Sequence, residues 1–262
     1  MLRELLKTVG VYKIYEQWLY HQVDKTPEKL PQHIGVIIDG NRRWAYSRGL
    51  PFLEGHKQGV IVAKEFLQWC YGLGIKTVSV YVFSTENFKR SKDQVEGILR
   101  LIETQVKELA ADKRIHEYEV RTKAMGRLNL LPDSLQKNIK EIEYKTKDYD
   151  KHYLNILIAY GGESEIVDAT KEIGKDLLKG KIALDQINEE LLGKYLYTAE
   201  LPEPRPDLVV RTSGEQRLSG FMPLQSTYSE LLFLDAYWPD FRRIDFLRAI
   251  RTYQKRKRRF GV

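Results

Sequence analysis

The chain has 262 residues, a hydrophobic fraction of 42% and a formal net charge of +7 at pH 7. This length is ample for a buried core, the composition argues against intrinsic disorder, and no apolar run is long enough to span a membrane. The lone cysteine, Cys70, excludes an intramolecular disulfide, and together with an N-terminus that lacks a secretory signal it predicts a cytoplasmic protein.

Apolar and aromatic residues recur at helical spacing from Leu2 to Val23, which predicts an amphipathic N-terminal helix. The favoured interpretation is a helix that packs on the body of the protein. The alternative is a helix that lies on a membrane surface, with Trp18 and Tyr20 at the interface.

Further along the chain, strand-like and helix-like segments alternate. Short apolar runs typical of buried strands lie near 33–38, 76–83, 119–125, 153–160, 207–211 and 230–235. Helical segments lie near 55–72, 92–111, 133–147, 163–178, 187–197 and 243–258. The alternation predicts a single α/β domain with a central, mostly parallel six-stranded sheet flanked by helices.

The first predicted strand is followed directly by Asp39-Gly40-Asn41-Arg42-Arg43-Trp44. Open α/β sheets bind ligands at the carboxyl ends of their strands. The carboxylate of Asp39 can hold a divalent cation, Gly40 lets the backbone approach a ligand, and the next three residues donate hydrogen bonds suited to a diphosphate. A structural ion pair at a strand end explains this hexapeptide, taken alone, equally well.

Two more strand ends carry similar groups. The fifth strand leads into a loop in which Arg211, Arg217 and Ser219 could converge on one phosphate. Glu230 lies a little downstream and is a candidate second carboxylate near the cation. The second strand leads into Ser84-Thr85-Glu86-Asn87-Phe88-Lys89-Arg90. Three such strand ends are hard to explain by packing alone, so they predict a site for phosphorylated ligands.

The basic run Lys255–Arg259 supplies much of the net charge. Such a run is typical of a solvated segment or of a nucleic-acid patch. No paired zinc ligands and no aromatic RNA-binding motif accompany it in the sequence, so a nucleic-acid partner is not expected.

Six blocks of the sequence resemble the cis-prenyltransferase family, which includes undecaprenyl diphosphate and dehydrodolichyl diphosphate synthases. The blocks are IGVIIDGNRRW (34–44), EGHKQG (54–59), VYVFSTENFKR (80–90), LNILIAYGG (154–162), DLVVRTSGEQRLSGF (207–221) and YSELLFLDAYWPDF (228–241). They stand in the family's order and cover nearly everything from about residue 31 onward. The chain therefore divides into an N-terminal helix, residues 1–30, and a catalytic domain, residues 31–262. Arg42 and Gln216 resemble the archaeal and eukaryotic branch.

The resemblance implies an enzyme that adds isopentenyl diphosphate units to farnesyl or geranylgeranyl diphosphate and makes a long-chain (Z)-polyprenyl diphosphate, precursor of a lipid carrier for glycosylation. It also implies an apolar tunnel for the growing chain, lined in part by the helix near 92–111. The product length is left open. A non-catalytic partner subunit of the same fold is the alternative, although Asp39 and Asn87, which such subunits usually lose, are both present.

The resemblance also assigns roles to residues. Mg²⁺ would be held by Asp39 and, as second ligand, by Glu230. The cradle for the allylic diphosphate would be formed by Gly40, Asn41, Arg42, Arg43, Trp44 and Arg90. Isopentenyl diphosphate would be bound by Arg211, Arg217 and Ser219. The condensation and the removal of a proton would involve, besides Asp39, the side chains of Asn87, Ser84 and His56.

The sequence Arg259-Phe260-Gly261 matches the family's C-terminal Arg-x-Gly, which reaches across a dimer to the partner's isopentenyl diphosphate. The match implies a homodimer whose substrate sites include Arg259 and Gly261. Peripheral contact with the cytoplasmic face of a membrane would suit a lipid product. Two places depart from the family pattern: Phe52 stands where many members carry arginine, and Met222-Pro223-Leu224 replaces a common Leu-Leu-Trp.

Overall fold

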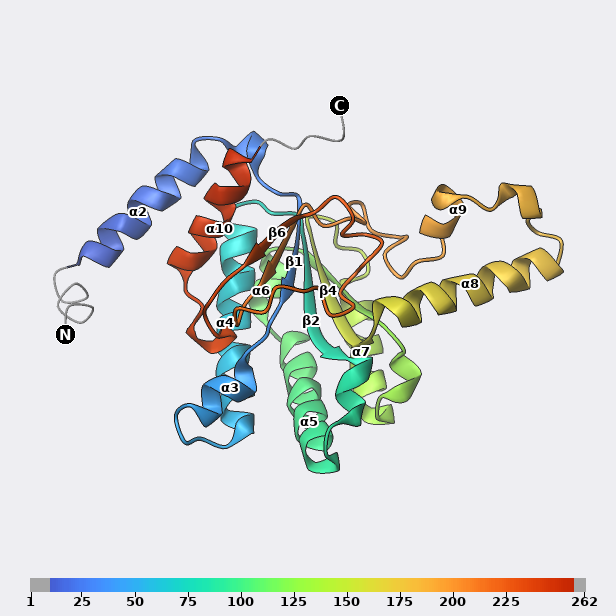
Figure 1. The fold of residues 1–262 in the computed structure, drawn as a ribbon, viewed down its shortest axis with the longest axis horizontal. Coiled ribbons are helices and arrows are strands. Elements are labelled where there is room, and N and C mark those ends of the chain that lie inside the picture. The colour runs from blue at the N-terminus through green and yellow to red at the C-terminus, as the bar shows by residue number, and fades with distance from the viewer. Residues whose placement is uncertain (1–9, 257–262) are drawn as a thin grey trace.

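The structure, a computed structural model, describes residues 10–256 and is built around one β-sheet (Figure 1). Within those residues the sheet has six strands, all parallel, in the order β3-β4-β2-β1-β5-β6. The strands are β1 (His33–Ile37), β2 (Thr77–Ser84), β3 (Val120–Met125), β4 (His152–Tyr160), β5 (Leu208–Arg211) and β6 (Glu230–Phe233). The prediction of a six-stranded, mostly parallel sheet is confirmed.

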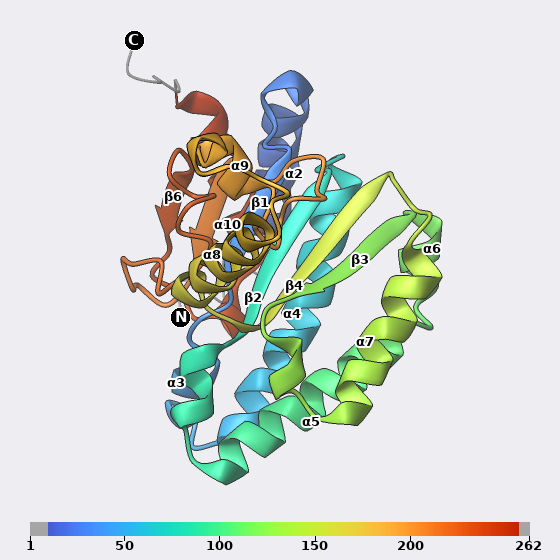
Figure 2. The ribbon, with the colours of Figure 1, turned by 90° about the vertical axis from the view of Figure 1, so that its right-hand side faces the viewer.

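Helices cover both faces of this sheet. They are α2 (Val11–Asp24), α3 (Asn41–Tyr46), α4 (Phe52–Gly72), α5 (Lys92–Leu109), α6 (Lys113–Glu117), α7 (Asp133–Thr146), α8 (Gly162–Leu178), α9 (Glu189–Gly193) and α10 (Arg243–Lys255). Figure 2 shows α4 behind the sheet, α5 below it, α7 to its right and α8 in front of it. In Figure 1, α2 lies alongside α10, and α8 points away from the sheet with α9 above it.

The first strand shows why these apolar runs form a central sheet. All five residues of β1 are buried, because helices cover both faces and neighbouring strands cover both edges. Ile34 and Val36 join a core with Phe66 of α4. Ile37 points to the opposite face, where it packs in a cluster with Phe221. The loop that follows β1 therefore starts from a rigid support.

The short helix α3 was not predicted from the sequence. It packs closely against α4 because two residues of α4 at the contact are glycines. A Cβ atom on Gly55 would lie 1.9 Å from the carbonyl oxygen of Asn41, and one on Gly59 would lie 2.3 Å from its Oδ1. The indole nitrogen of Trp238 also donates to the carbonyl of Gly59, at 2.8 Å. The glycines of the EGHKQG block thus allow the contact that presses the Asp39–Arg43 segment against the sheet.

The N-terminal helix is described from Val11, and residues 1–9 lie outside the described residues. Leu19 and Val23 are buried in the same core as residues of α10, which confirms the interpretation as a packed helix for this stretch. Another side of α2 stays open: Ile14 is 66% exposed and Trp18 45%. None of the helices between residues 10 and 256 is long and apolar enough to cross a bilayer.

Candidate active site

Three predicted strand ends meet at one edge of the sheet. In the register of the parallel pairs, Ile37 of β1 lies opposite Tyr81 of β2 on one side and Arg211 of β5 on the other. Asp39 follows two residues after β1, and Arg211 is the last residue of β5. The carboxyl ends of β1, β2 and β5 therefore present their loops to a common space, as the sequence predicted.

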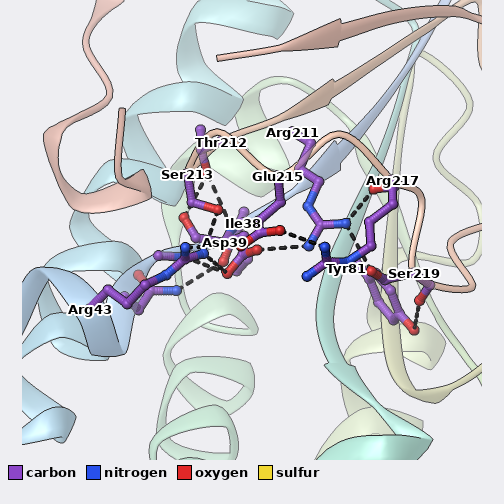
Figure 3. A network of polar contacts seen from close by, with 12 residues as sticks. Ile38, Asp39, Arg43, Tyr81, Arg211, Thr212, Ser213, Glu215, Arg217 and Ser219 are labelled. Carbon is purple, nitrogen blue, oxygen red and sulfur yellow. Dashed lines mark hydrogen bonds and ion pairs between the residues drawn. The ribbon is translucent and has the colours of Figure 1, made fainter. Parts of the chain in front are cut away.

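Asp39 is the centre of a polar network at this edge (Figure 3). Its Oδ1 accepts from the backbone N–H of Gly40 at 2.7 Å, and its Oδ2 accepts from Nη2 of Arg211 at 2.8 Å. Burial alone would raise the pKa of this carboxyl. Hydrogen bonds from Arg211 and Ser213, with the charges of Arg211 and Arg43, outweigh burial and hold the pKa below its usual value. Asp39 is therefore ionised at neutral pH.

A second carboxylate, Glu215, belongs to the same network, and no role was predicted for it from the sequence. Arg43 donates to Glu215 Oε1 at 3.1 Å and its Nη2 lies 3.4 Å from Asp39 Oδ1, so one guanidinium joins the two acids. Arg217 approaches the other oxygen of Glu215 at 2.6 Å. A cluster of two acids and several arginines results, in which each acid has at least one cationic partner (Figure 3).

The predicted group Arg211, Arg217 and Ser219 is brought together. Arg211, whose side chain is 5% exposed, donates from Nη1 to the hydroxyl of Ser219 at 2.8 Å and to the backbone carbonyl of Arg217. The guanidinium of Arg217 is 64% exposed. Arg211 therefore organises the loop from inside, while Arg217 offers its charge to the solvent-facing side.

Gly40 and Asn41 build the loop as well as facing the cavity. Gly40 has a φ of 103°, and a Cβ atom there would lie 2.7 Å from the ring of Tyr237, so both conformation and space call for glycine. The side-chain amide of Asn41 donates to the carbonyl of Ile38 at 2.9 Å. These contacts fix the direction in which α3 leaves the sheet.

On the other side of Asp39, two arginines lack acidic partners. Within residues 10–256, the guanidiniums of Arg42 and Arg90 make no hydrogen bond or ion pair. Burial, and then the charge of Arg42, lowers the pKa of Arg90, although Asp39 opposes this. Arginine nevertheless keeps its proton in proteins. Two cations that repel each other across a partly buried space form a site ready for an anion.

His56 of α4 lies beside these two arginines. Its Nε2 is buried and has no hydrogen-bond partner among the residues that the structure describes. Burial lowers the pKa of His56 to about 4, and the charges of Arg90 and Arg42 act in the same direction. The imidazole is therefore neutral at pH 7, with a ring nitrogen left for a ligand.

Ser84 and Asn87 form the turn that ends β2. The backbone N–H of Ser84 donates to Oδ1 of Asn87 at 3.1 Å, and the Ser84 side chain accepts from the backbone of Asn87 in return. This capping box gives both residues a structural role. Both also line the cavity described next, so their predicted chemical role stays a prediction.

A cavity of about 1010 Å³ leads from this site into the space between the sheet and the helices α4 and α5. Its polar end is lined by Asp39, Arg42, Arg43, His56, Arg90, Arg211, Arg217 and Ser219. Its apolar part is lined by Val80, Val82, Leu154 and Ile156 of the sheet and by Ile98, Leu101, Ile102, Val106 and Leu109 of α5. The arrangement fits the predicted tunnel, although Val95 and Leu99 of the same helix do not line it.

Two predicted site residues lie elsewhere. Glu230 is the first residue of β6, opposite Leu208, so it lies at the amino edge of the parallel sheet, and it pairs with Arg256. Glu230 as a second ligand beside Asp39 is therefore wrong for a site built from one chain. Trp44 donates to Asp240 at 2.9 Å and does not line the cavity in this chain, so its contact with substrate stays a prediction.

Arg259 and Gly261 lie outside the described residues.

The two departures from the family pattern, at Phe52 and at Met222-Pro223-Leu224, have a local explanation. The ring of Phe52 meets the ring of His56 edge-on, with centroids 6.1 Å apart. Met222 is fully buried, and Pro223 lies so close to Gly162 that a Cβ atom there would be 2.2 Å from it.

Comparison with known proteins identifies the family of the chain. The sequence profile of a prenyltransferase family described as putative undecaprenyl diphosphate synthase matches residues 37–261. The chain therefore belongs to the undecaprenyl diphosphate synthase family of cis-prenyltransferases, and the predicted resemblance is confirmed. Its fold is that of cis-prenyltransferase structures.

Particular relatives sharpen this assignment. A tritrans,polycis-undecaprenyl-diphosphate synthase (geranylgeranyl-diphosphate specific) of Methanocaldococcus jannaschii is 52% identical over 98% of this chain and 91% of its own length. A Pyrococcus abyssi protein of the same name is 51% identical over 95% and 93%. The crystal structure of lavandulyl diphosphate synthase from Lavandula x intermedia, in complex with dimethylallyl diphosphate, matches with a TM-score of 0.85 and 35% identity over 90% of this chain and all of that one.

Proposed function

We propose that the protein condenses isopentenyl diphosphate units onto geranylgeranyl diphosphate and makes a long-chain (Z)-polyprenyl diphosphate. One observation carries the proposal: the unpaired guanidiniums of Arg42 and Arg90 lie at the mouth of a cavity whose far part is apolar. A molecule with a diphosphate head and a hydrocarbon tail matches both ends of that space. The specificity stated in the names of the archaeal relatives favours geranylgeranyl over farnesyl diphosphate as starter.

The two diphosphates would occupy different sides of Asp39. The allylic diphosphate would bind to Arg42 and Arg90, where no acid competes with it within residues 10–256. Isopentenyl diphosphate would bind to Arg217 and Ser219, which follow β5. Holding two anionic substrates side by side brings the reacting carbons together and avoids the entropic cost of their encounter.

Catalysis would consist mainly of stabilising the leaving group. The C–O bond of the allylic diphosphate breaks and leaves a delocalised carbocation, while the diphosphate gains negative charge. The double bond of isopentenyl diphosphate supplies the electron pair for the new C–C bond, and a proton then leaves the added unit. Guanidiniums fixed before the substrate arrives stabilise the charge that develops on the diphosphate.

The donor set fits a divalent cation. Asp39 and Glu215 lie within reach of one guanidinium, and Mg²⁺ typically uses one or two carboxylates together with substrate phosphate oxygens. Bound there with the diphosphate, Mg²⁺ would neutralise charge on the leaving group. Among the described residues no group of three acids, histidines or cysteines could hold a metal without substrate. The chain's own part is to keep Asp39 ionised through Arg211.

The loss of the proton needs an acceptor near the new bond. His56 is neutral at pH 7 and has a buried Nε2 without a partner, so it can accept a hydrogen bond or a proton from the bound substrates. Asn87 and Ser84 line the same cavity and would orient the diphosphate or a bridging water. In this scheme burial, together with the charges of Arg90 and Arg42, keeps the imidazole neutral until the anion arrives.

The proposal includes a homodimer in which Arg259 and Gly261 complete the partner's site. Mixing two inactive variants tests it: Asp39→Ala with an intact tail, and a chain truncated after Arg258 that keeps Asp39. Each mixed dimer would contain one site with both elements, so activity should partly return. No recovery after verified subunit exchange would show that the tail does not act in trans.

The proposal also includes peripheral contact with a membrane on its cytoplasmic face, where the product would serve as a glycosyl carrier lipid. The open side of α2 supports this, because Arg251 stacks on Trp18 at 4.5 Å and Arg248 on Tyr15 at 5.1 Å. Aromatic and basic side chains together are typical of helices that lie on anionic bilayers. Sedimentation with phosphatidylglycerol vesicles, but not with neutral vesicles, is expected.

Incorporation of radiolabelled isopentenyl diphosphate into butanol-extractable lipid tests the central proposal. The protein alone should extend geranylgeranyl diphosphate faster than farnesyl diphosphate, and EDTA should stop both reactions. Activity that appears only when a second, homologous subunit is added would favour the alternative of a non-catalytic partner. The presence of Asp39 and Asn87 speaks against that alternative.

A further inference from the structure

Two helices line the apolar part of the cavity, and each presents one stripe of side chains to it. On α4, beyond His56, the stripe consists of Gly59, Val60, Ala63, Lys64 and Leu67; on α5, beyond Ile98, it consists of Leu101, Ile102, Gln105, Val106 and Leu109. The spacing of three and four residues is that of a single helix face. Within these two stripes, the polar side chains are Lys64 and Gln105.

Lys64 reaches from α4 to the helix that carries Gln105. Lys64 donates from Nζ to Glu108 Oε2 at 2.8 Å, and Glu108 stands one turn beyond Gln105 on the same helix face. The Lys64 side chain is 35% exposed, so its aliphatic stem lies along the cavity while its charged end reaches Glu108. Eight residues separate Lys64 from His56, or roughly 12 Å along the helix axis.

Gln105 makes this place unusual. Its Oε1 is buried and has no hydrogen-bond partner within residues 10–256, although it belongs to a cavity lined otherwise by hydrocarbon at this depth. A buried amide oxygen without a protein partner can be hydrated while the cavity holds water. A hydrocarbon chain that passes it removes that water and supplies no donor, which is unfavourable.

We infer that Lys64, Gln105 and Glu108 form a polar collar that sets the length at which the growing chain stops. The inference rests on the proposed function, because it concerns the same cavity. The collar acts in two ways: Gln105 opposes the passage of hydrocarbon, and the Lys64–Glu108 ion pair holds α4 to α5 so that the chain does not leave between them. Leu67 and Leu109 also line the cavity, farther along the two helices, so a chain that passes the collar finds further apolar wall.

The product distribution of two variants tests the collar. Gln105→Leu keeps the size of the side chain and removes its polarity, while Lys64→Met keeps the length and removes the ion pair. Each should shift the main product to longer chains by one or more C5 units at retained turnover. Lys57→Met is the matched control, because Lys57 pairs with Glu54 on the same helix and does not line the cavity; its products should match those of the wild type.

A second measurement does not depend on turnover. Titration calorimetry with n-alkyl diphosphates of increasing length should show wild-type affinity that rises with length and then levels off when the alkyl end reaches the collar. In Gln105→Leu the affinity should continue to rise to longer chains. Thermal unfolding of each variant verifies that it is folded.

The outcomes separate the two proposals. If wild-type protein binds the alkyl series as described but incorporates no isopentenyl diphosphate, the proposed function fails, and the collar stands as a barrier to a bound hydrocarbon chain rather than to a growing one. If the wild type makes polyprenyl products and both variants keep its product lengths and its binding plateau, the collar is overturned and the function stands. Shorter products, or an equal shift in Lys57→Met, would also overturn the collar.

Discussion

The arginines on the two sides of Asp39 differ in whether they have partners within the protein. On the paired side, Arg43, Arg211 and Arg217 each contact a carboxylate or a backbone oxygen. On the unpaired side, Arg42 and Arg90 lie beside a neutral His56 and have no acid among the residues described. On the paired side the positive charges are balanced without a ligand. On the unpaired side the charges repel each other until an anion binds between them. Structural support and readiness for substrate are thus separated within one site.

The largest effect is expected where the two sides meet. Asp39→Asn keeps the shape of the side chain but removes the charge that Arg211 and a metal would share. Turnover should fall by at least about 10²–10³, the usual result of losing one well-placed electrostatic group. Steady-state incorporation of isopentenyl diphosphate at saturating Mg²⁺ measures it. The control is Asp176→Asn, because Asp176 is a partly exposed acid of α8 that pairs with Lys181 and does not line the cavity; its turnover should equal that of the wild type. Retention of a tenth of the wild-type turnover would contradict the assignment.

The contrast between the sides predicts different stabilities for two arginine variants. Arg211→Ala leaves a partly buried carboxylate without its main partner, so the free energy of unfolding should fall by about 3 kcal/mol. Arg90→Ala removes a partly buried cation whose repulsion from Arg42 outweighs its attraction to Asp39, so stability should be unchanged or higher, while affinity for the allylic diphosphate drops by about 1.5–3 kcal/mol. Urea denaturation and substrate titration measure the two quantities. Equal destabilisation by both variants would abolish the distinction between the sides.

The neutral His56 predicts how stability depends on pH. The pKa of His56 is about 4 in the folded protein and about 6.5 in an unfolded chain, so the unfolded state binds a proton first as the pH falls. Stability contributed by this group is complete above pH 6.5 and is lost down to pH 4, by about 2 kcal/mol between pH 7 and pH 5. In His56→Gln the free energy of unfolding, measured by urea titration at each pH, should fall less between pH 7 and pH 5 than in the wild type. His33, whose pKa is also about 4, keeps its own contribution in both proteins. If the free energy of unfolding depends on pH in the same way with and without His56, the assignment to His56 is wrong.

The smallest effect is expected at the exposed end of the paired side. Arg217→Ala should raise KM for isopentenyl diphosphate about tenfold, because a charge-assisted phosphate contact is worth about 1.5 kcal/mol at its lower limit. KM for the allylic starter should change much less, since Arg217 follows β5 and not β1. Arg205→Ala, a loop arginine before the same strand, should change neither constant. Similar increases for both substrates would refute the division of the site.

Most of the sheet could be predicted because parallel strands buried on both faces are continuous apolar runs. Asp39, Arg211 and Ser219 were brought together correctly for a related reason, since the carboxyl ends of neighbouring parallel strands meet at one edge. Glu230 was placed at the wrong edge because the direction of its strand was not considered. It begins a strand, so the same rule places it at the opposite edge. A stricter use of strand direction would have excluded it.

Pairing between side chains was the part that the sequence could not reveal. Glu215 lies in a block that the analysis singled out, yet nothing in one sequence says which acid faces Arg43, 172 residues away. The direction of Trp44 was equally hidden, because no helix was predicted for the segment after Gly40. In the structure that segment is α3, which directs the indole to Asp240, away from the cavity.

The ion pair between Asp39 and Arg211 also bears on how the protein is made. The two residues are 172 positions apart, and the strands that carry them, β1 and β5, are direct neighbours. In a nascent chain one edge of β1 therefore stays uncovered until β5 has left the ribosome. Contacts of such long range make folding slow. The site consequently assembles last, and a prematurely terminated chain lacks half of it however well its first strands have formed.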